Sequence, residues 1–224
     1  MRVVIFGATG MLGAGALLEC LDEPRVGSVL VIARRPTGVV HAKVTEVIHA
    51  DFFKYDDLRS RFAACDACFF CLGVSSVGMS EDAYHHLTYD LTLAAAGAMV
   101  GASPQMTFCY VSGQGTDSTE RGRAMWARVK GKTENALLRL PFKAAYMLRP
   151  GFIQPLRGVR SSTGFTRAFY AVTAPIFPVL RLLAGNHITT TVNIGRALIH
   201  LAAEGDPKRI LGPRDINRLA AARV

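Results

Sequence analysis

The sequence has few charged and few aromatic side chains, and it lacks any long uninterrupted apolar run. Charged residues make up 19% and aromatic residues 8% of the 224 positions, whereas 50% are hydrophobic. This composition excludes a largely disordered chain and suits a single α/β domain with a sizeable core. The stretch nearest to a membrane span, residues 168–184, is interrupted by Pro175, Pro178 and Arg181, so we expect no transmembrane segment.

Acidic residues are scarce relative to basic ones. The chain has 17 Asp and Glu against 26 Lys and Arg, which gives a formal net charge of +9. Such a charge suits an anionic ligand, nucleic acid or an anionic membrane surface. Neither a long basic run nor an interleaving of basic and aromatic residues is present, so we expect no nucleic-acid partner. Peripheral contact with a membrane stays open as an alternative.

Cysteines are few, odd in number and without an accompanying export signal. We interpret these five thiols as reduced and predict a cytoplasmic location. Cys65, Cys68 and Cys71 have a C-x2-C-x2-C spacing that could suggest a metal, but no fourth cysteine lies nearby. Cys68 and Cys71 also fall on a predicted strand over residues 67–72, where positions three apart face opposite sides. We therefore expect buried thiols and no metal.

The most informative stretch is a glycine motif that follows an apolar strand. Residues 3–6 are apolar, Gly7, Gly10 and Gly13 follow at three-residue spacing, and residues 12–21 have helical periodicity. In dinucleotide-binding loops the first glycine allows the tight turn, the second admits the pyrophosphate and the third lets the helix approach the sheet. Free N–H groups at the helix start hold the anion. The glycines also interrupt the apolar helix that a signal peptide needs, so we predict nucleotide binding.

Two arginines end the second predicted strand, residues 29–33. In NAD-binding folds an acidic residue about 20 positions beyond the glycines bonds the ribose 2′-hydroxyl. Here that place is taken by Arg34 and Arg35. Guanidinium groups would instead neutralise a 2′-phosphate through charge-assisted, often bidentate hydrogen bonds. We therefore predict NADP(H) rather than NAD, with a solvated basic turn as the alternative.

Predicted strands alternate with predicted helices along most of the chain. This alternation implies a parallel sheet with helices on both faces and right-handed crossovers, a doubly wound Rossmann fold. We expect one domain over residues 1–224, with a dinucleotide-binding core at 1–153 and a substrate-side segment with a closing strand and helices at 154–224. The predicted strands are residues 3–6, 29–33, 44–49, 67–72, 105–111, 144–148 and 208–211, and the predicted helices are 12–21, 56–64, 80–99, 126–140, 192–203 and 216–222.

The segment after Gln154 has a looser pattern. Arg157, Arg160 and Arg167 punctuate a loop that contains glycine and serine, and apolar segments follow. We interpret this segment as a substrate lid or pocket. A membrane-facing surface or a contact with a second subunit in a homodimer is the alternative. The sequence leaves open whether these arginines meet lipid, phosphate or water.

The chain resembles the short-chain dehydrogenase/reductase superfamily, specifically its atypical branch. It is similar in pattern to small oxidoreductases related to Tat-interacting protein and to bacterial nucleoside-diphosphate-sugar epimerase-like proteins. The resemblance rests on Gly7-Ala8-Thr9-Gly10-Met11-Leu12-Gly13, Ala33-Arg34-Arg35-Pro36, Asp51-Phe52, Cys71-Leu72-Gly73, Val111-Ser112, Lys130 and Leu148-Arg149-Pro150-Gly151.

The resemblance implies a set of site residues. In this superfamily a Tyr-x-x-x-Lys pair on a helix and a serine after the fifth strand carry the chemistry. Ser112 and Lys130 match, but Trp126 stands at the tyrosine position. The residues expected to bind the cofactor are Gly7, Thr9, Gly10, Met11, Leu12, Gly13, Arg34, Arg35, Asp51, Phe52, Leu72, Gly73, Lys130, Pro150, Gly151 and Phe152.

The tryptophan changes the expected chemistry, because an indole is not a practical general acid or base. Another donor could substitute: Tyr84, Tyr89, His85 or a water held by Ser112. The reaction could instead need only hydride donation, or the protein could bind NADPH without catalysis.

We expect an oxidoreductase acting on a small hydrophobic carbonyl or enone. A non-catalytic NADPH sensor with a partner is the alternative, and an epimerase is a second. No Gly-x-Ser-x-Gly elbow and no cluster of metal-ligand spacing is present, so neither a hydrolase nor a metal site is expected.

Overall fold

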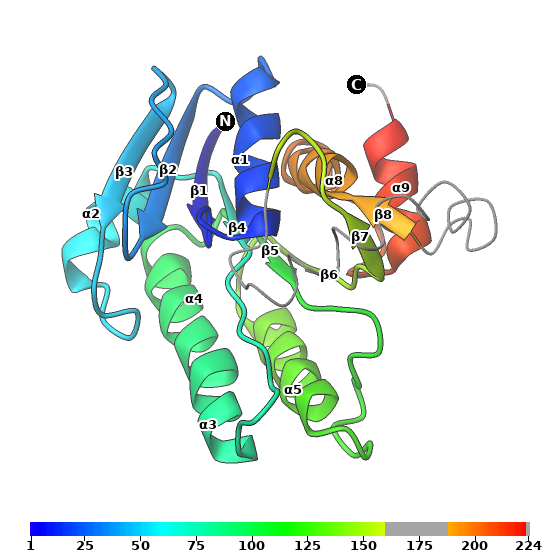
Figure 1. Ribbon diagram of the computed structural model, residues 1–224. Coiled ribbons are helices and arrows are strands. Elements are labelled where there is room, and N and C mark those ends of the chain that lie inside the picture. Colours follow the sequence, from blue (N-terminus) through cyan, green and yellow to red (C-terminus); the bar gives the residue numbers. More distant parts are fainter. Residues whose placement is uncertain (160–187, 223–224) are drawn as a thin grey trace.

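The computed structural model describes residues 1–159 and 188–222. Its centre is a parallel sheet with the strand order β3-β2-β1-β4-β5-β6-β9 (Figure 1). The chain runs outward from β1 in one direction and then returns to β4 on its other side, which creates a switch point between β1 and β4. The strands are β1 (Arg2–Phe6), β2 (Ser28–Ala33), β3 (Val44–Ile48), β4 (Ala67–Phe70), β5 (Thr107–Val111), β6 (Ala144–Leu148) and β9 (Ile210–Leu211).

Helices cover both faces of the sheet and bury separate hydrophobic clusters (Figure 1). In β1, Val3 and Ile5 belong to one cluster while Val4 and Phe6 belong to the other, because successive side chains of a strand alternate in direction. The predicted doubly wound Rossmann fold is therefore confirmed. One face carries α1 (Met11–Asp22), α8 (Thr191–Ala203) and α9 (Pro213–Ala221), and the other carries η1 (Asp56–Leu58), α2 (Arg59–Ala63), α4 (Leu91–Ala102) and α5 (Met125–Arg139).

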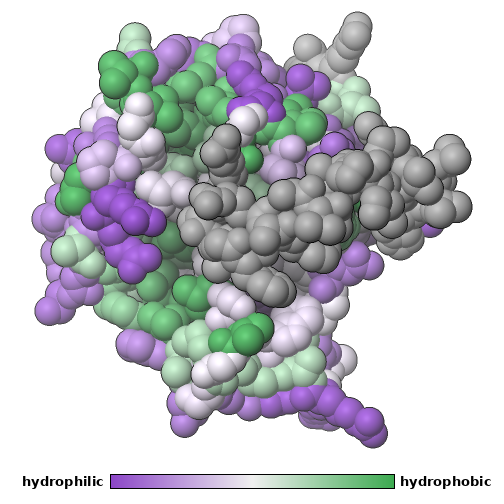
Figure 2. All heavy atoms as spheres, in the orientation of Figure 1, coloured by the Kyte–Doolittle hydropathy of each residue, from purple (hydrophilic) through white to green (hydrophobic). Residues whose placement is uncertain are grey.

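The helix predicted over residues 80–99 is interrupted in the structure. It consists of α3 (Glu81–His85), a π-helical turn η2 (His86–Asp90) and then α4. The wider π turn is frequent at functional sites and leaves no signature in hydrophobic periodicity. None of the described helices is long and apolar enough to cross a membrane. The face of the molecule in Figure 2 carries both hydrophilic and hydrophobic residues.

Two helices on the same face, α1 and α8, approach each other through glycines. A Cβ on Gly15 would lie 2.8 Å from the Cβ of Thr191, and a Cβ on Gly195 would lie 2.7 Å from the Cγ of Glu19. Glu19 is buried there, and its carboxylate pairs with Arg157 at 2.8 Å and with Arg196 at 3.1 Å. The close crossing thus fixes an acidic group inside the helix layer.

Of the arginines that follow Gln154 in the loop, Arg157 contacts acidic residues of α1. Its guanidinium bonds Glu19 and lies 2.6 Å from Asp22, so it holds the segment after β6 against α1. Arg160, Arg167 and the apolar stretch at 168–184 lie outside the described residues, as does much of the segment predicted as a lid. The sequence also missed a small parallel pair, β7 (Phe152–Gln154) with β8 (Ile188–Thr190).

The cysteine pattern behaves as the strand spacing predicts. Cys68 is buried in the cluster under α2, α4 and α5, whereas Cys71 packs against the cluster under α1 and α8. Burial raises the pKa of the Cys71 thiol to about 12 and that of Cys65 to about 11. Among the described residues, no three metal-ligating side chains converge.

Candidate dinucleotide site

The turn between β1 and α1 requires glycine at two positions. Gly7 has a φ of +81°, and a Cβ there would lie 2.8 Å from the carbonyl of Cys71. A Cβ on Gly13 would lie only 2.2 Å from the carbonyl oxygen of Gly7. Gly10 closes the turn by donating its N–H to the same oxygen at 2.9 Å. The three glycines therefore create a backbone cradle that any side chain would fill.

The start of α1 is suited to an anion. Gly10 precedes the helix without a side-chain cap, and the first turn contains no acidic residue. Met11 and Leu12 occupy this turn and are half-buried. The exposed N–H groups and the positive end of the helix dipole remain available for a phosphate.

A pocket of about 340 Å³ opens beside this turn, at the carboxyl ends of the neighbouring strands. It joins segments that the sequence singled out separately, so the structure brings the glycine motif and the two arginines together. Both arginines are exposed and form no ion pair with any described residue. The lining residues are Gly7, Thr9, Ile32, Ala33, Arg34, Arg35, Phe52 and Leu72.

The predicted adenine contacts differ in character. Phe52 is 7% exposed and its ring lies edge-on to Phe6, with 6.1 Å between centroids, so it is a core residue whose edge lines the pocket. Asp51 is exposed, and its Oδ1 accepts from the backbone N–H of Phe53 at 3.0 Å. Asp51 therefore stabilises its own turn. Gly73 is exposed, and a Cβ there would meet nothing within 4 Å, so packing does not require glycine at this position.

A network of polar side chains lies at the carboxyl end of β5. The Ser112 hydroxyl donates to Oε1 of Glu134 at 2.5 Å and lies 3.1 Å from the carbonyl oxygen of Leu148. The Lys130 ammonium donates to the carbonyl oxygen of Ser112 at 2.7 Å. Glu134 is fully buried and forms an ion pair with Arg149. The predicted pair Ser112 and Lys130 thus meets directly, and the network adds Glu134, which the sequence analysis did not name.

Burial dominates the electrostatics of Lys130. It lowers the pKa of the ammonium to about 8, and the carboxylate of Glu134 opposes this shift. Glu134 follows Lys130 by four positions on α5, so the two share one helix face. That spacing was the available signal for Glu134, an acid on a face that is otherwise largely apolar.

Trp126 occupies the start of the same helix and is half-buried. A Cβ on Gly115 would lie 3.2 Å from Cη2 of its indole, so the ring covers the turn after β5. Gly115 has a φ of +89°, which also requires glycine.

The proposed substitute donors do not gather around Lys130. His85 and Tyr89 contact Lys132 instead: its Nζ lies 3.1 Å from Nε2 of His85 and 5.0 Å from the Tyr89 ring centre. Two positions along a helix point in nearly opposite directions, so these groups lie on another face of α5. Tyr84 is buried, and burial raises the pKa of its phenol.

The segment after β6 lies beside the Ser112 turn. The N–H of Ser112 donates to the carbonyl oxygen of Leu148, and that of Gln114 to the carbonyl oxygen of Pro150, both at 2.8 Å. This ladder extends the pairing of β5 with β6 and brings Pro150 and Gly151 to the carboxyl edge of the sheet. Phe152 begins β7 next to them.

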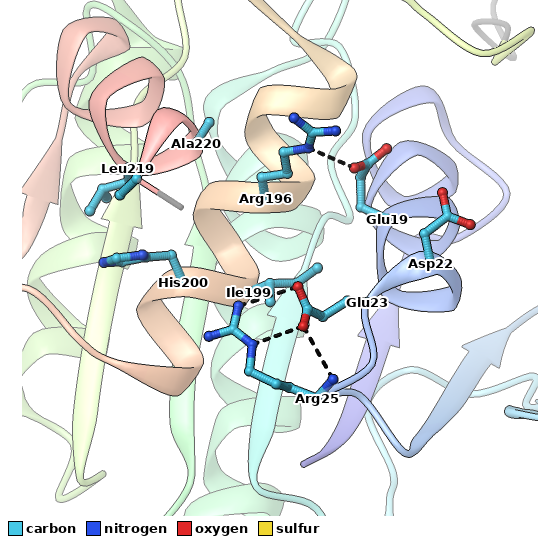
Figure 3. Close-up of a pocket in the computed structure, with 10 residues that line it drawn as sticks. Glu19, Asp22, Glu23, Arg25, Arg196, Ile199, His200, Leu219 and Ala220 are labelled. Atoms are coloured by element: carbon cyan, nitrogen blue, oxygen red, sulfur yellow. Dashed lines mark hydrogen bonds and ion pairs between the residues drawn. The ribbon is translucent and has the colours of Figure 1, made fainter. Parts of the chain in front are cut away.

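A second pocket, of about 350 Å³, lies apart from this site between α1, α8 and α9 (Figure 3). Its charged groups already neutralise one another. Arg196 bonds Glu19, and Arg25 bonds Glu23 at 2.8 Å. Unlike Arg34 and Arg35, these guanidinium groups are not free for an anionic ligand.

Known proteins share both sequence and fold with this chain, although no family model matches it. It is 29% identical over 159 residues to the mitochondrial protein fmp52 of Emericella nidulans, covering 68% of this chain and 66% of that protein. It is 24% identical over 225 residues to HTATIP2 of Rattus norvegicus, covering 93% and 92%. The chain is a homologue of FMP52 and HTATIP2.

Solved structures superpose on this chain and show which fold it shares with known proteins. A short-chain dehydrogenase/reductase of Saccharomyces cerevisiae superposes with a TM-score of 0.64 at 15% identity, covering 98% of both chains. The enzyme WbmF of Bordetella bronchiseptica, in complex with NAD⁺, superposes with a TM-score of 0.68 at 15% identity, covering 98% of this chain and 76% of that one. At this level of identity the likenesses show the fold that the chain shares with these proteins.

The comparisons correct the predicted location of this FMP52 and HTATIP2 homologue. The FMP52 relatives from Emericella nidulans, Meyerozyma guilliermondii and Saccharomyces cerevisiae are named mitochondrial, so the cytoplasmic prediction is wrong. Reduced thiols exclude an oxidising compartment but do not distinguish one reducing compartment from another. The chain also spans slightly less than two thirds of the Emericella and Meyerozyma proteins, at 66% and 65% of their lengths.

Proposed function

We propose that this protein binds NADP(H) and acts as an oxidoreductase on a small hydrophobic carbonyl or enone. The observation that carries the proposal is the pair of exposed guanidinium groups, Arg34 and Arg35, on the wall of the pocket that opens at the glycine turn. A nicotinamide dinucleotide also accords with the NAD⁺ complex of WbmF, a protein of the same fold. The NADP preference rests on the arginines alone.

The site residues fit such a cofactor in three parts. The backbone cradle from Gly7 to Gly13 and the start of α1 would hold the pyrophosphate. Arg34 and Arg35 would neutralise the 2′-phosphate. Phe52 and Leu72 would form the apolar walls against the adenine.

When bound, the reduced nicotinamide would supply a hydride to the substrate carbon. The chain would orient the substrate oxygen near Ser112 and Lys130, between Trp126 and the Pro150 segment. Because the Ser112 hydroxyl donates to Glu134, the substrate oxygen would take its hydrogen bond from Lys130.

Calorimetric titration of NADPH and NADH tests the cofactor. We expect NADPH to bind the wild type about 10- to 100-fold more tightly than NADH, and Arg34→Ala/Arg35→Ala to abolish the difference. Arg61→Ala/Arg139→Ala is the matched control, because it removes the same charge from the last turns of α2 and α5. Equal affinity of the wild type for both dinucleotides would overturn the proposal.

A second function, NADPH sensing without catalysis, is favoured by Trp126 at the position of the expected phenol. Hydride turnover over a broad panel of aldehydes, ketones and enones separates the two. Turnover that Lys130→Ala and Ser112→Ala both abolish supports the enzyme. Tight NADPH binding with no turnover on any compound of the panel supports the sensor.

A further inference from the structure

We infer that the Lys130 ammonium itself donates the proton to the substrate oxygen, in place of the missing phenol, from the position in which the carbonyl oxygen of Ser112 holds it. This inference rests on the proposed reductase function and names the acid of the same site. It assigns to the lysine a direct chemical role beyond holding a ribose.

The position of Lys130 allows this role. Its side chain leaves α5 toward the carboxyl end of β5, where Nζ donates to the carbonyl oxygen of Ser112 at 2.7 Å. An ammonium has three N–H donors, so two remain for a ligand. The indole of Trp126, one turn earlier on the same face, is far too weak an acid to donate its proton to a substrate near neutral pH.

The surroundings leave the ammonium without a dedicated counter-ion. Glu134 shares its helix face, but that carboxylate is occupied by the guanidinium of Arg149 and by the hydroxyl of Ser112. No carboxylate lies within ion-pair distance of Lys130 among the described residues. A buried ammonium in this situation loses its proton more readily than an exposed one, and its pKa falls to about 8.

The other titratable groups around the site do not compete for this role. The phenol of Tyr110, on β5, is buried, and burial raises its pKa. Burial likewise raises the pKa of the phenol of Tyr84, on α3. Glu134, on α5, raises the pKa of Lys130, and Arg149, at the end of β6, neutralises Glu134. Lys130 is therefore the group whose proton is transferable near neutral pH.

The step balances in atoms and charge. The carbonyl carbon gains a hydride from the reduced dinucleotide, the C=O π pair moves onto the oxygen, and that oxygen takes a proton from Nζ of Lys130. The lysine becomes a neutral amine and then takes up H⁺ from the solvent, so each reduction consumes one hydride from the dinucleotide and one H⁺. In the reverse direction the neutral amine would accept the proton of the alcohol.

The substitution Lys130→Arg distinguishes two roles of this lysine: donating a proton to the substrate, or only holding the ribose of the cofactor. Arginine keeps the positive charge and the hydrogen-bond donors, but it does not release a proton in the working range of pH. We expect NADPH affinity within about threefold of the wild type and kcat on the carbonyl panel lower by about 10²- to 10⁴-fold. Lys132→Arg, two positions away on the other side of α5, is the matched control and should leave both unchanged.

Two further readouts complete the test. The wild-type kcat/KM for reduction should decline above about pH 8, and ¹³C NMR of the lysine Cε signals, with Lys130→Arg for assignment, should show Lys130 titrating near that value. If Lys130→Arg keeps kcat, or if Lys130 titrates near 10.5, the donor role is overturned while the reductase function stands. If the wild type itself turns over nothing, the reductase function fails, and the donor role fails with it.

Discussion

The hydroxyl of Ser112 lies 2.5 Å from Oε1 of Glu134 and donates its proton there. This bond joins the end of β5 to the middle of α5, and the ion pair of Glu134 with Arg149 extends it to the end of β6. Three elements of the carboxyl edge thus meet at one buried carboxylate. The arrangement fixes the direction of the Ser112 hydroxyl before any ligand arrives.

The substitution Glu134→Gln tests how much this carboxylate contributes to the stability of the fold. The amide keeps the shape and can still accept from Ser112, but it leaves the partly buried Arg149 without a counter-charge. Breaking a buried pair in this way costs about 3–5 kcal/mol, so we expect the free energy of unfolding in urea to fall by about 3 kcal/mol. Glu81→Gln, which breaks the more exposed pair with Arg128, should cost less than about 1 kcal/mol. Equal losses in the free energy of unfolding would show that the buried ion pair contributes no more to stability than the exposed one.

Local sequence patterns predicted most of this fold. The seven strands of the main sheet and the helices between them lie within a few residues of the predicted ranges, because a short apolar run marks most of the strands and helical periodicity marks the helices. The pair β7–β8 was missed, since three-residue strands are too short to show alternation. The π turn at His86–Asp90 also leaves no signal in the pattern.

Site residues could be predicted where the local backbone conformation determines the residue type. They could not be predicted where contacts between distant parts of the sequence determine it. Gly7 and Gly13 could be placed because only glycine fits their turn. The spacing of four from Lys130 was a signal for Glu134, but its ion pair could not be predicted, because the partner Arg149 is 15 residues away in sequence and on another element. Asp51 is the opposite case, because the bond of its Oδ1 to the N–H of Phe53 is local, and a capping role is common for an Asp that follows a strand.

Gly13→Ala should abolish dinucleotide binding. Its Cβ would lie 2.2 Å from the carbonyl oxygen of Gly7, so the helix must move away from the turn that holds the pyrophosphate. We expect NADPH affinity to fall by at least about 100-fold, together with a lower melting temperature. Gly97→Ala in α4 is the control: a Cβ there meets nothing within 4 Å, and alanine should stabilise the helix by about 0.5–1 kcal/mol without changing binding. Unchanged affinity of Gly13→Ala would contradict the cradle.

Lys130→Met should stabilise the protein at pH 7 while removing its activity. The folded state lowers the pKa of Lys130 from 10.5 to about 8, so below pH 8 the fold carries a buried charge whose cost is on the order of 3 kcal/mol. The lost hydrogen bond to Ser112 reduces the expected gain to about 2 kcal/mol. Between pH 8 and pH 10.5 the unfolded state binds more protons than the folded one, so the wild type gains stability as the pH rises. The difference in free energy of unfolding between Lys130→Met and the wild type therefore becomes smaller. Urea unfolding of the variant and the wild type at pH 7 and pH 10 measures this difference. A difference that is as large at pH 10 as at pH 7 would contradict the lowered pKa.

Arg157 combines two opposing contributions to stability. Its φ is +60°, a left-handed conformation that costs about 1–2 kcal/mol in residues with a Cβ, and its guanidinium pairs with Glu19 and Asp22. Arg157→Ala and Arg157→Gly lose the same ion pairs, but only glycine is free of the backbone cost. We therefore expect the glycine variant to be more stable than the alanine variant by about 1 kcal/mol in urea unfolding. The reverse order would show that the alanine variant relaxes this turn out of the left-handed region, and then the ion pairs alone hold the segment against α1.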